Sequence, residues 1–329
     1  MHVLVIGGAG YIGSHCVRLL RQAGHETWVY DNLSRGHRDA ARADRLIEGD
    51  LHDVPKLVDV LQTRRIDAVM HFAAFALVGE SVADPAIYYR NNVAATLDLL
   101  EAMRTAGVER IVFSSTTATY GVPDRMPITE ETPQQPINPY GFSKLVVEHV
   151  LDDYAKAYGI GFAALRYFNA AGAAPAGDIG EDHHPESHLI PIVLQVALGQ
   201  RDAVTLFGDD YPTPDGTCVR DYVHVDDLGT AHVKALEQLR PGDQVKLNLG
   251  TGKGYSVRQV IEACRRVTDH SIPVRVGPRR PGDPPELVAD SSRAQKTLDW
   301  KPHYTSIDAI VATAWNWHRT HPHGYATEI

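Results

Sequence analysis

The chain has 329 residues, of which 43% are hydrophobic and 22% charged, and 41 acidic against 32 basic residues give a net charge of -9. This composition excludes a disordered or fibrous protein, and the length suits about two domains of roughly 150 residues. The negative net charge does not favour binding to nucleic acid or to an anionic membrane surface. We therefore expect a soluble globular protein that binds neither.

The cysteines and the amino-terminal segment bear on the compartment. Cys16, Cys218 and Cys264 lie far apart, form no C-x-x-C pair, and are too few for a disulfide framework in a chain of this length. The apolar run 3–6 begins without a preceding basic segment or cleavage site, and nowhere do about 18 apolar residues run together. We expect a cytoplasmic protein without a membrane span.

The first half of the chain alternates short β-branched runs with longer helical patterns, which is typical of βαβ units. We expect six strands, near residues 2–7, 26–31, 45–49, 67–72, 110–115 and 161–166. We expect helices at 12–23, 53–63, 85–106 and 140–158. Gly24 and Gly107 stand where the residue after a helix end belongs. The pattern predicts an α/β fold built on a doubly wound parallel sheet of the Rossmann type.

The local composition changes near residue 170, where clusters of glycine and proline begin. Loops of this kind suit a smaller domain that wraps a ligand. We predict a nucleotide-binding domain over residues 1–170 and a smaller C-terminal substrate-binding domain over 171–329. The run Val245–Leu249 has the pattern of a further strand, so a segment around 220–250 is expected to cross back to the sheet.

A glycine-rich turn follows the first expected strand. Gly7, Gly10 and Gly13 allow the backbone to approach a pyrophosphate, and the helix start that follows offers free N–H groups and the positive end of its dipole. A tight turn without a ligand is the alternative. Asp31 ends the next expected strand, where a carboxylate accepts hydrogen bonds from ribose hydroxyls and disfavours a 2′-phosphate. The sequence therefore favours NAD over NADP.

The prediction of a dinucleotide site has two further points, one on Asp31 and one on Asp50. Asp31 also suits an Asx turn before Asn32, which is compatible with ribose binding. Asp50, which ends the third expected strand, is a candidate contact to the adenine edge. Taken alone, Asp50 would be an ordinary loop aspartate.

A candidate catalytic group follows the fifth expected strand. Tyr140 and Lys144 are four residues apart, which places both side chains on one helix face, and Thr116 stands at the end of the strand. An ammonium beside a phenol favours the phenolate, so we expect Lys144 to lower the pKa of Tyr140 toward the range of a general base. An isolated Y-x-x-x-K pair is more often a surface feature, but its place after this strand favours catalysis.

Longer motifs extend along essentially the whole chain, and the segment 208–225 is the most specific of them. The motifs are Gly7–Gly13, His71–Ala74, Val78–Ser81, Asn91–Val93, Tyr140–Lys144, Leu165–Asn169, Phe207–Gly208, Asp210–Thr213, Asp215–Thr217, Val219–Val225 and Arg279–Asp283. Through them the sequence resembles the extended short-chain dehydrogenase/reductase family, and within it the UDP-hexose 4-epimerases.

The resemblance implies a reaction without net oxidation or reduction. Tyr140 would take the proton of the sugar 4-hydroxyl while resident NAD accepts the C4 hydride, and the resulting 4-keto sugar would turn over before the hydride returns to its other face. UDP-galactose and UDP-glucose would be interconverted in this way. Lys144 would hold the nicotinamide ribose and tune Tyr140, and Thr116 would hydrogen-bond the reacting hydroxyl.

The resemblance also implies two sets of binding residues. Besides Tyr140 and Lys144, the expected NAD-binding residues are Gly7, Gly10, Tyr11, Ile12, Gly13, Asp31, Asn32, Asp50, Leu51, Phe72, Ala73, Asn91 and Tyr167. Besides Thr116, the expected UDP-sugar-binding residues are Asn169, His188, Leu189, Phe207, Arg220, Tyr222, Arg280, Asp283 and Leu287. Arginine suits this task because its planar donors match phosphate oxygens. Without the resemblance, the arginines would equally suit surface ion pairs and Phe207 the core.

Four positions depart from the family pattern. Thr116 stands where many members have serine and keeps the hydroxyl, whereas Ala76 stands where a lysine contacts NAD in well-known members. His188 replaces an asparagine that commonly meets the diphosphate. Leu287 stands where a tyrosine or a small residue gates the sugar pocket, so we expect weak acceptance of UDP-N-acetyl sugars.

Alternatives remain at this stage. A related epimerase for UDP-N-acetylhexosamines, UDP-pentoses or UDP-uronic acids is one, and a non-catalytic NAD-binding sensor is another. The seventeen histidines show no spacing of a zinc or iron site, so we expect no metal. The apolar stripe of helix 85–106 suits either a homodimer interface, as in related dimers, or the core; we expect a homodimer.

Overall fold

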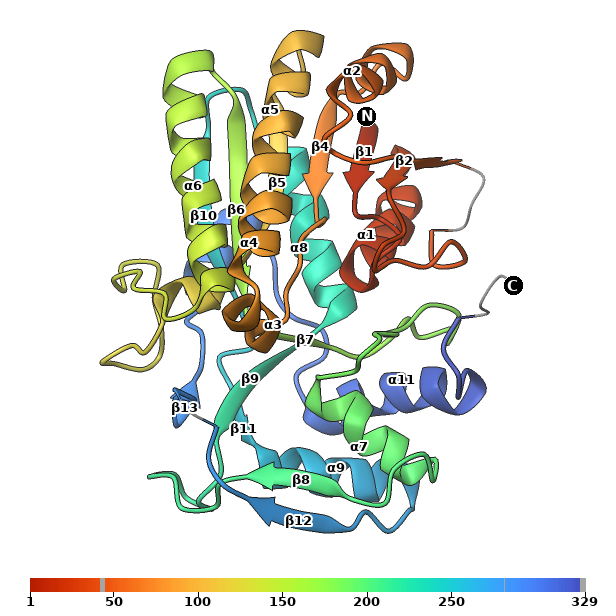
Figure 1. Ribbon diagram of the computed structural model, residues 1–329, viewed down its shortest axis with the longest axis vertical. Coiled ribbons are helices and arrows are strands. Elements are labelled where there is room, and N and C mark those ends of the chain that lie inside the picture. Colours follow the sequence, from red (N-terminus) through yellow and green to blue (C-terminus); the bar gives the residue numbers. More distant parts are fainter. Residues whose placement is uncertain (42–44, 281, 326–329) are drawn as a thin grey trace.

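The computed structural model describes residues 1–41, 45–280 and 282–325. A large α/β unit lies above a smaller unit (Figure 1). Seven parallel strands form the sheet of the large unit, in the order β10-β6-β5-β4-β1-β2-β3. These strands are β1 (His2–Ile6), β2 (Glu26–Asp31), β3 (Leu46–Glu48), β4 (Ala68–His71), β5 (Arg110–Thr116), β6 (Gly161–Tyr167) and β10 (Gln244–Leu249).

Helices cover both faces of this sheet because its strands bury apolar side chains on both sides. In β1, Val3 and Val5 join the core cluster on one face, and Leu4 and Ile6 join the cluster on the other. The helices on the first face are α1 (Tyr11–Gln22), α8 (Val225–Gln238) and α10 (Ser292–Leu298), and those on the second are α2 (Val54–Thr63), α5 (Ala95–Ala106) and α6 (Pro139–Tyr158). Each fully buried aliphatic side chain contributes roughly 1.5–3 kcal/mol to this packing.

The prediction of a doubly wound α/β sheet is confirmed. Six strands lie where the sequence predicts them, and the expected later strand, β10, pairs with β6. The expected helix over 85–106 is not uniform, because α4 (Pro85–Tyr88) passes through a π-helical turn, η2 (Tyr89–Ala94), before α5 begins. The Asn92 side chain in this turn bonds both backbone groups of Phe75 and the Ser143 hydroxyl. Such turns are frequent at functional sites.

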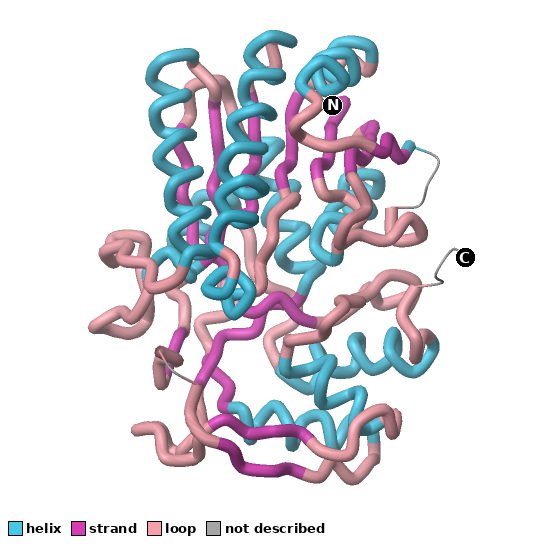
Figure 2. The backbone as a smooth tube through the Cα atoms, in the orientation of Figure 1, coloured by secondary structure: helices cyan, strands magenta, loops and turns pink. Residues whose placement is uncertain are grey.

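The smaller unit packs three helices against short strands. Its helices are α7 (Leu189–Ala197), α9 (Val257–Thr268) and α11 (Ile307–Thr320), and its strands are β7 (Asn169–Ala171), β8 (Val204–Phe207), β9 (Val219–His224), β11 (Gly254–Ser256), β12 (Val274–Gly277) and β13 (Glu286–Leu287). β9 pairs with β7, β11 and β13, and β8 pairs with β12. Figure 2 shows β7 and β9 at the junction of the two units.

The carboxyl ends of the sheet strands point toward the smaller unit (Figure 1). Two short helices, α3 (Val78–Ala83) and η3 (Thr117–Tyr120), follow β4 and β5 at this edge. In doubly wound sheets, ligands bind outside this edge, where the strand order reverses. Here the order reverses between β1 and β4. No helix within the described ranges is long and apolar enough to span a membrane.

Candidate active site

The glycine-rich turn forms a cradle that only glycine can build. Gly7 has a positive φ of 74°. A Cβ at Gly13 would lie 2.2 Å from the Gly7 carbonyl oxygen, so a side chain there would clash with the turn. Within the described residues, no side chain caps the start of α1 and no acidic residue lies in its first turn, which contains Tyr11 and Ile12. The N–H groups and the dipole of α1 are therefore available to an anion.

Asp31 closes the cradle from β2. Its carboxylate accepts hydrogen bonds from the Ala9 N–H at 2.9 Å and the Leu33 N–H at 2.8 Å. Burial raises the pKa of Asp31, and these two bonds oppose that rise. The bond to Leu33 is the Asx turn that the sequence suggests, and it leaves further lone pairs on the carboxylate for a ligand hydroxyl.

The residues that follow β3 extend this edge. The Asn32 amide donates to the Asp50 carboxylate at 2.9 Å, and the Tyr30 hydroxyl donates to the Asp50 carbonyl at 2.9 Å. Leu51 is buried directly beyond them. The pKa of Asp50 is lowered, chiefly by the hydrogen bond from the His52 N–H. Asp50 is therefore a fixed anionic group at the end of β3.

Phe72, Ala73 and Tyr167 lie on the other side of the reversal point. The Phe72 N–H donates to the Ile6 carbonyl at 2.8 Å, and a Cβ on Gly7 would meet the Ala73 nitrogen at 2.5 Å. Phe72 and Tyr167 both lie against the His232 ring, with centroid separations of 5.0 and 6.0 Å. The structure thus brings the expected residues after β1, β4 and β6 together.

Asn91 lies in the π-helical turn η2, next to the buried Asn92. Its amide donates to the Asn92 side chain at 3.0 Å, so it supports the π-helical turn. Asn92 itself is buried and ties that turn to α6. Asn92, which the sequence analysis did not name as a site residue, is therefore held more firmly than Asn91. The motif Asn91–Val93, which contains Asn92, was the sequence signal that could have identified it.

These features fit a dinucleotide. The glycine cradle and the uncapped helix suit a pyrophosphate, and the Asp31 carboxylate suits an adenosine ribose. Gly7, Gly10, Gly13, Tyr11 and Ile12 would hold the phosphates.

Tyr140 and Thr116 meet at the carboxyl end of β5. Tyr140 lies in the first turn of α6, which Asn138 caps by accepting from the Gly141 N–H at 2.8 Å. Thr116, the last residue of β5, lies beside the Tyr140 phenol and favours its ionised form. This places a hydroxyl beside a phenol at the edge of the sheet next to the cradle.

The expected effect of Lys144 on Tyr140 is wrong. Burial raises the pKa of Tyr140, and only the hydrogen bond from Thr116 opposes the rise. The Lys144 amine donates to the Ser114 carbonyl at 2.8 Å and lies 4.7 Å above the Phe113 ring. Burial lowers the pKa of Lys144 itself to about 7, against the opposing field of the Glu148 carboxylate. Loss of hydration on burial is therefore the main cause of the pKa shift of both Tyr140 and Lys144.

A buried polar network behind the pair was missed by the sequence analysis. Glu148, one turn after Lys144, accepts from the Arg166 Nε at 2.9 Å and also from the Ser115 hydroxyl. Arg166 donates to the Tyr120 hydroxyl at 2.7 Å, and Tyr120 donates to Asn248 at 2.7 Å. A charged residue within the buried strand β6 was the sequence indication, since such a charge needs a partner.

Several expected substrate residues form pairs in the smaller unit. The Arg280 guanidinium lies 4.2 Å above the Phe207 ring. Arg220 forms an ion pair with Asp283 and donates to the Pro284 carbonyl at 2.8 Å. Since Phe207 ends β8 and Arg220 lies in β9, distant segments converge here. An aromatic face and two guanidinium groups suit a nucleotide.

The other expected substrate residues occupy varied positions. Asn169 donates to the Asp221 carbonyl at 3.0 Å and so links β7 to β9. Leu287 is half-buried in β13 opposite Arg220. Tyr222 is only 5% exposed and belongs to the core of the smaller unit together with part of Leu189. Tyr222 therefore packs within β9, where residues 221–224 are all buried.

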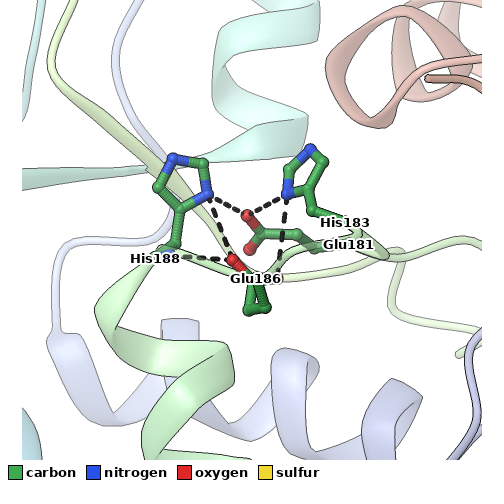
Figure 3. Close-up of side chains that lie close together, drawn as sticks. All are labelled: Glu181, His183, Glu186 and His188. Atoms are coloured by element: carbon green, nitrogen blue, oxygen red, sulfur yellow. Dashed lines mark hydrogen bonds and ion pairs between the residues drawn. The ribbon is translucent and has the colours of Figure 1, made fainter. Parts of the chain in front are cut away.

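His188 lies in a cluster of two histidines and two glutamates; the sequence analysis grouped His183, His184 and His188 but left out the glutamates. Glu181, His183, Glu186 and His188 lie close together on the loop before α7 (Figure 3). Burial disfavours the His183 imidazolium, but Glu181 and Glu186 outweigh it and raise the pKa of His183 to about 10. We expect no metal from the spacing of the histidines alone, but the loop folds both glutamates onto both histidines.

The fold and the site define a dinucleotide-binding α/β protein with a tyrosine–threonine pair at its sheet edge. Residues 3–250 match the NAD dependent epimerase/dehydratase family, and the chain belongs to this family. It is 55% identical to the UDP-glucose 4-epimerase of Halalkalibacterium halodurans over 329 residues, which covers 100% of this chain and 98% of that protein.

Solved structures agree with the sequence relatives. A crystal structure of a UDP-glucose 4-epimerase superposes with a TM-score of 0.96 at 50% identity and covers 99% of this chain and 100% of that one. The UDP-glucose 4-epimerase of Bifidobacterium longum, solved in complex with NAD+ and UDP, gives a TM-score of 0.94 at 41% identity and covers 99% and 100%. The resemblance to UDP-hexose 4-epimerases is therefore confirmed.

Proposed function

We propose that this protein interconverts UDP-galactose and UDP-glucose at C4 with NAD as a resident cofactor. The observation that carries the proposal is the contact between Tyr140 and Thr116 at the edge of the sheet beside the glycine cradle. A sensor that only binds NAD has no use for such a pair. NAD held in the cradle would accept the C4 hydride and return it.

Residues of the chain would transfer the proton and bind the UDP. Tyr140 would take the proton of the sugar 4-hydroxyl, and Thr116 would orient that hydroxyl and hydrogen-bond the phenol. Lys144, whose pKa of about 7 lies near neutrality, would supply a positive charge on the same helix face. Arg220, Arg280 and Phe207 would hold the UDP, because guanidinium groups match phosphate oxygens and an aromatic ring can stack on a base. The smaller unit, formed by 171–329 apart from α8, β10 and α10, would thereby bind substrate, while the large unit binds NAD.

The direct test is NMR of the purified protein with UDP-galactose and no added NAD. Appearance of UDP-glucose is expected, and it would show epimerisation and a retained cofactor together. Conversion only after NAD is added would indicate weak retention, which Ala76 in place of a lysine would explain. No conversion under either condition would contradict the proposal.

We also propose a cytoplasmic homodimer. The cysteines Cys16, Cys218 and Cys264 are all buried free thiols, which suits a reducing compartment. Exposed apolar side chains gather on neighbouring elements of one face of the large unit: Val82 on α3, Tyr89 on η2, Leu97 on α5 and Phe142 on α6. The Tyr89 and Phe142 rings are 6.4 Å apart, so the patch is continuous there. A second copy of this chain would cover it.

A further inference from the structure

The loop before α7 carries four potential metal ligands on one turn of chain. Glu181, His183, Glu186 and His188 each direct one nitrogen or oxygen toward a common point (Figure 3), and these atoms all lie within 4.8 Å of one another. Their spacing, E-x-H-x-x-E-x-H, places all four within eight residues. His188 is also one of the expected UDP-sugar-binding residues, whereas Glu181, His183 and Glu186 are not.

The distances between these atoms approach those of a tetrahedral site. His183 Nδ1 lies 3.3 Å from Glu181 Oε1 and 3.7 Å from Glu186 Oε2, and His188 Nδ1 lies 3.8 Å from Glu186 Oε1. His188 Nδ1 and Glu181 Oε1 are in direct contact. Zinc–ligand bonds of about 2.0–2.1 Å in a tetrahedron separate neighbouring ligands by about 3.3 Å. To admit the ion, the His188–Glu181 contact would have to open and one Glu186 oxygen would have to serve both histidines.

The donor chemistry selects the class of metal. Two imidazole nitrogens and two carboxylate oxygens suit zinc and neighbouring first-row divalent ions, whereas magnesium prefers six oxygen ligands. Both carboxylates together balance the charge of a divalent ion. Glu181 and Glu186 each have side chains only 4% exposed, so water competes weakly for them.

Contacts from outside the cluster hold the ligands in place. Trp317 Nε1 on α11 donates to the Glu181 carbonyl at 3.2 Å. Within the cluster, the Glu186 carboxylate accepts the His188 backbone N–H at 2.7 Å. The edge of the Tyr11 ring packs against His183, with centroids 6.1 Å apart, and the Tyr11 hydroxyl donates to the Gly172 carbonyl at 2.6 Å. Such outer contacts fix the orientation of metal ligands.

We propose that Glu181, His183, Glu186 and His188 form a tetrahedral site for one divalent transition-metal ion, with zinc as the best match. Binding replaces the protons shared between imidazoles and carboxylates, which leave to solvent. The ion would tie this loop and the start of α7 to Tyr11 in the first turn of α1. Its role is structural, and it is tested by metal binding rather than by epimerase activity.

The test is metal binding by the full chain after treatment with a chelator. We expect uptake of one zinc ion per chain, and the intense visible absorption of tetrahedral cobalt when cobalt is added instead. His188→Ala should weaken zinc binding by at least about tenfold, since even outer-shell changes cost 10- to 100-fold. His184→Ala is the matched control, because its side chain in the same loop is 78% exposed and lies outside the ligand set.

Circular dichroism would show that each variant folds. If His188→Ala does not fold, Glu186→Gln takes its place, and the cobalt spectrum of the unaltered protein decides by itself. The proposal is overturned if the unaltered protein takes up no stoichiometric zinc, if its cobalt spectrum is octahedral, or if a folded ligand variant binds zinc as tightly as His184→Ala. In those cases the four side chains form only an ion-pair cluster.

Discussion

The Tyr140 phenol is the residue on which the proposed chemistry depends. We expect Tyr140→Phe to fold normally and to epimerise UDP-galactose about 10²- to 10⁴-fold more slowly, because it lacks the proton acceptor. NMR of product formation measures the rate. Tyr158→Phe is the control, since this tyrosine at the end of α6 is 53% exposed. A Tyr140→Phe rate close to that of Tyr158→Phe would refute the assignment of the base.

Lys144 links the site to pH-dependent stability. Its pKa is lowered by burial from 10.5 to about 7 in the folded chain. Between these values the unfolded state binds the extra proton, so this group makes the protein more stable as pH rises from 7 toward 10.5, and below 7 the buried ammonium is a cost. The change between pH 6 and pH 9 amounts to about 2–3 kcal/mol.

We therefore expect the gain in unfolding free energy from Lys144→Met, relative to the unaltered protein, to be larger at pH 6 than at pH 9 by about that amount. Urea denaturation of both proteins at both pH values measures it. Lys156→Met is the control, because that lysine is 66% exposed on the same helix. An equal difference between the two proteins at both pH values would contradict a buried amine with a lowered pKa.

At the scale of elements, Glu148 and Arg166 join α6 to β6. Their side chains are 1% and 3% exposed, so the ion pair is fully desolvated. We expect Glu148→Gln to lower the unfolding free energy by about 3–5 kcal/mol, since it leaves the Arg166 charge buried without a counter-ion. Chemical denaturation measures the loss.

The exposed ion pair between Glu262 and Arg265 on α9 provides the comparison. Glu262 is 54% exposed, and Glu262→Gln should cost no more than about 1 kcal/mol. If the two variants lost the same stability, the buried network would not be what anchors α6.

Sequence patterns predicted elements where a strand or helix is continuous. The strands of the sheet are short runs buried on both faces, so their apolar residues are consecutive and easily recognised. The region 85–106 has equally regular apolar spacing, and nothing in that spacing shows that Asn92 holds a π-helical turn against Phe75 and Ser143. α3 is only six residues long, which is too short for periodicity to be detected.

At the scale of the whole molecule, the site depends on which segments meet. The shared helix face of Tyr140 and Lys144 was predictable, because residues four apart in a helix lie on the same face. Arg166 and Glu148 come from a strand and a helix, and Phe207 and Arg280 from a strand and a distant loop, so only the folded chain pairs them. Glu181 and Glu186 show the opposite case: the four proposed ligands lie within eight residues of sequence, but their convergence depends on how the loop turns.

The exposed apolar patch over α3, η2, α5 and α6 bears on the assembly. Leu97 is 38% exposed on α5, so a charge there leaves the folded monomer intact but would be buried and unpaired in a dimer formed through this face. We expect the unaltered protein to be a dimer at micromolar concentration and Leu97→Glu to be monomeric, as measured by light scattering.

Val276→Glu separates a specific interface from general surface hydrophobicity. Val276 is 57% exposed on β12 in the smaller unit, away from the α5 and α6 face (Figure 1). Non-specific association through exposed apolar residues would be weakened by both Leu97→Glu and Val276→Glu. A dimer formed through α5 and α6 should instead be unchanged in Val276→Glu. If Leu97→Glu remained a dimer, the interface would lie elsewhere on the surface. If the unaltered protein were monomeric, the proposed homodimer would be refuted.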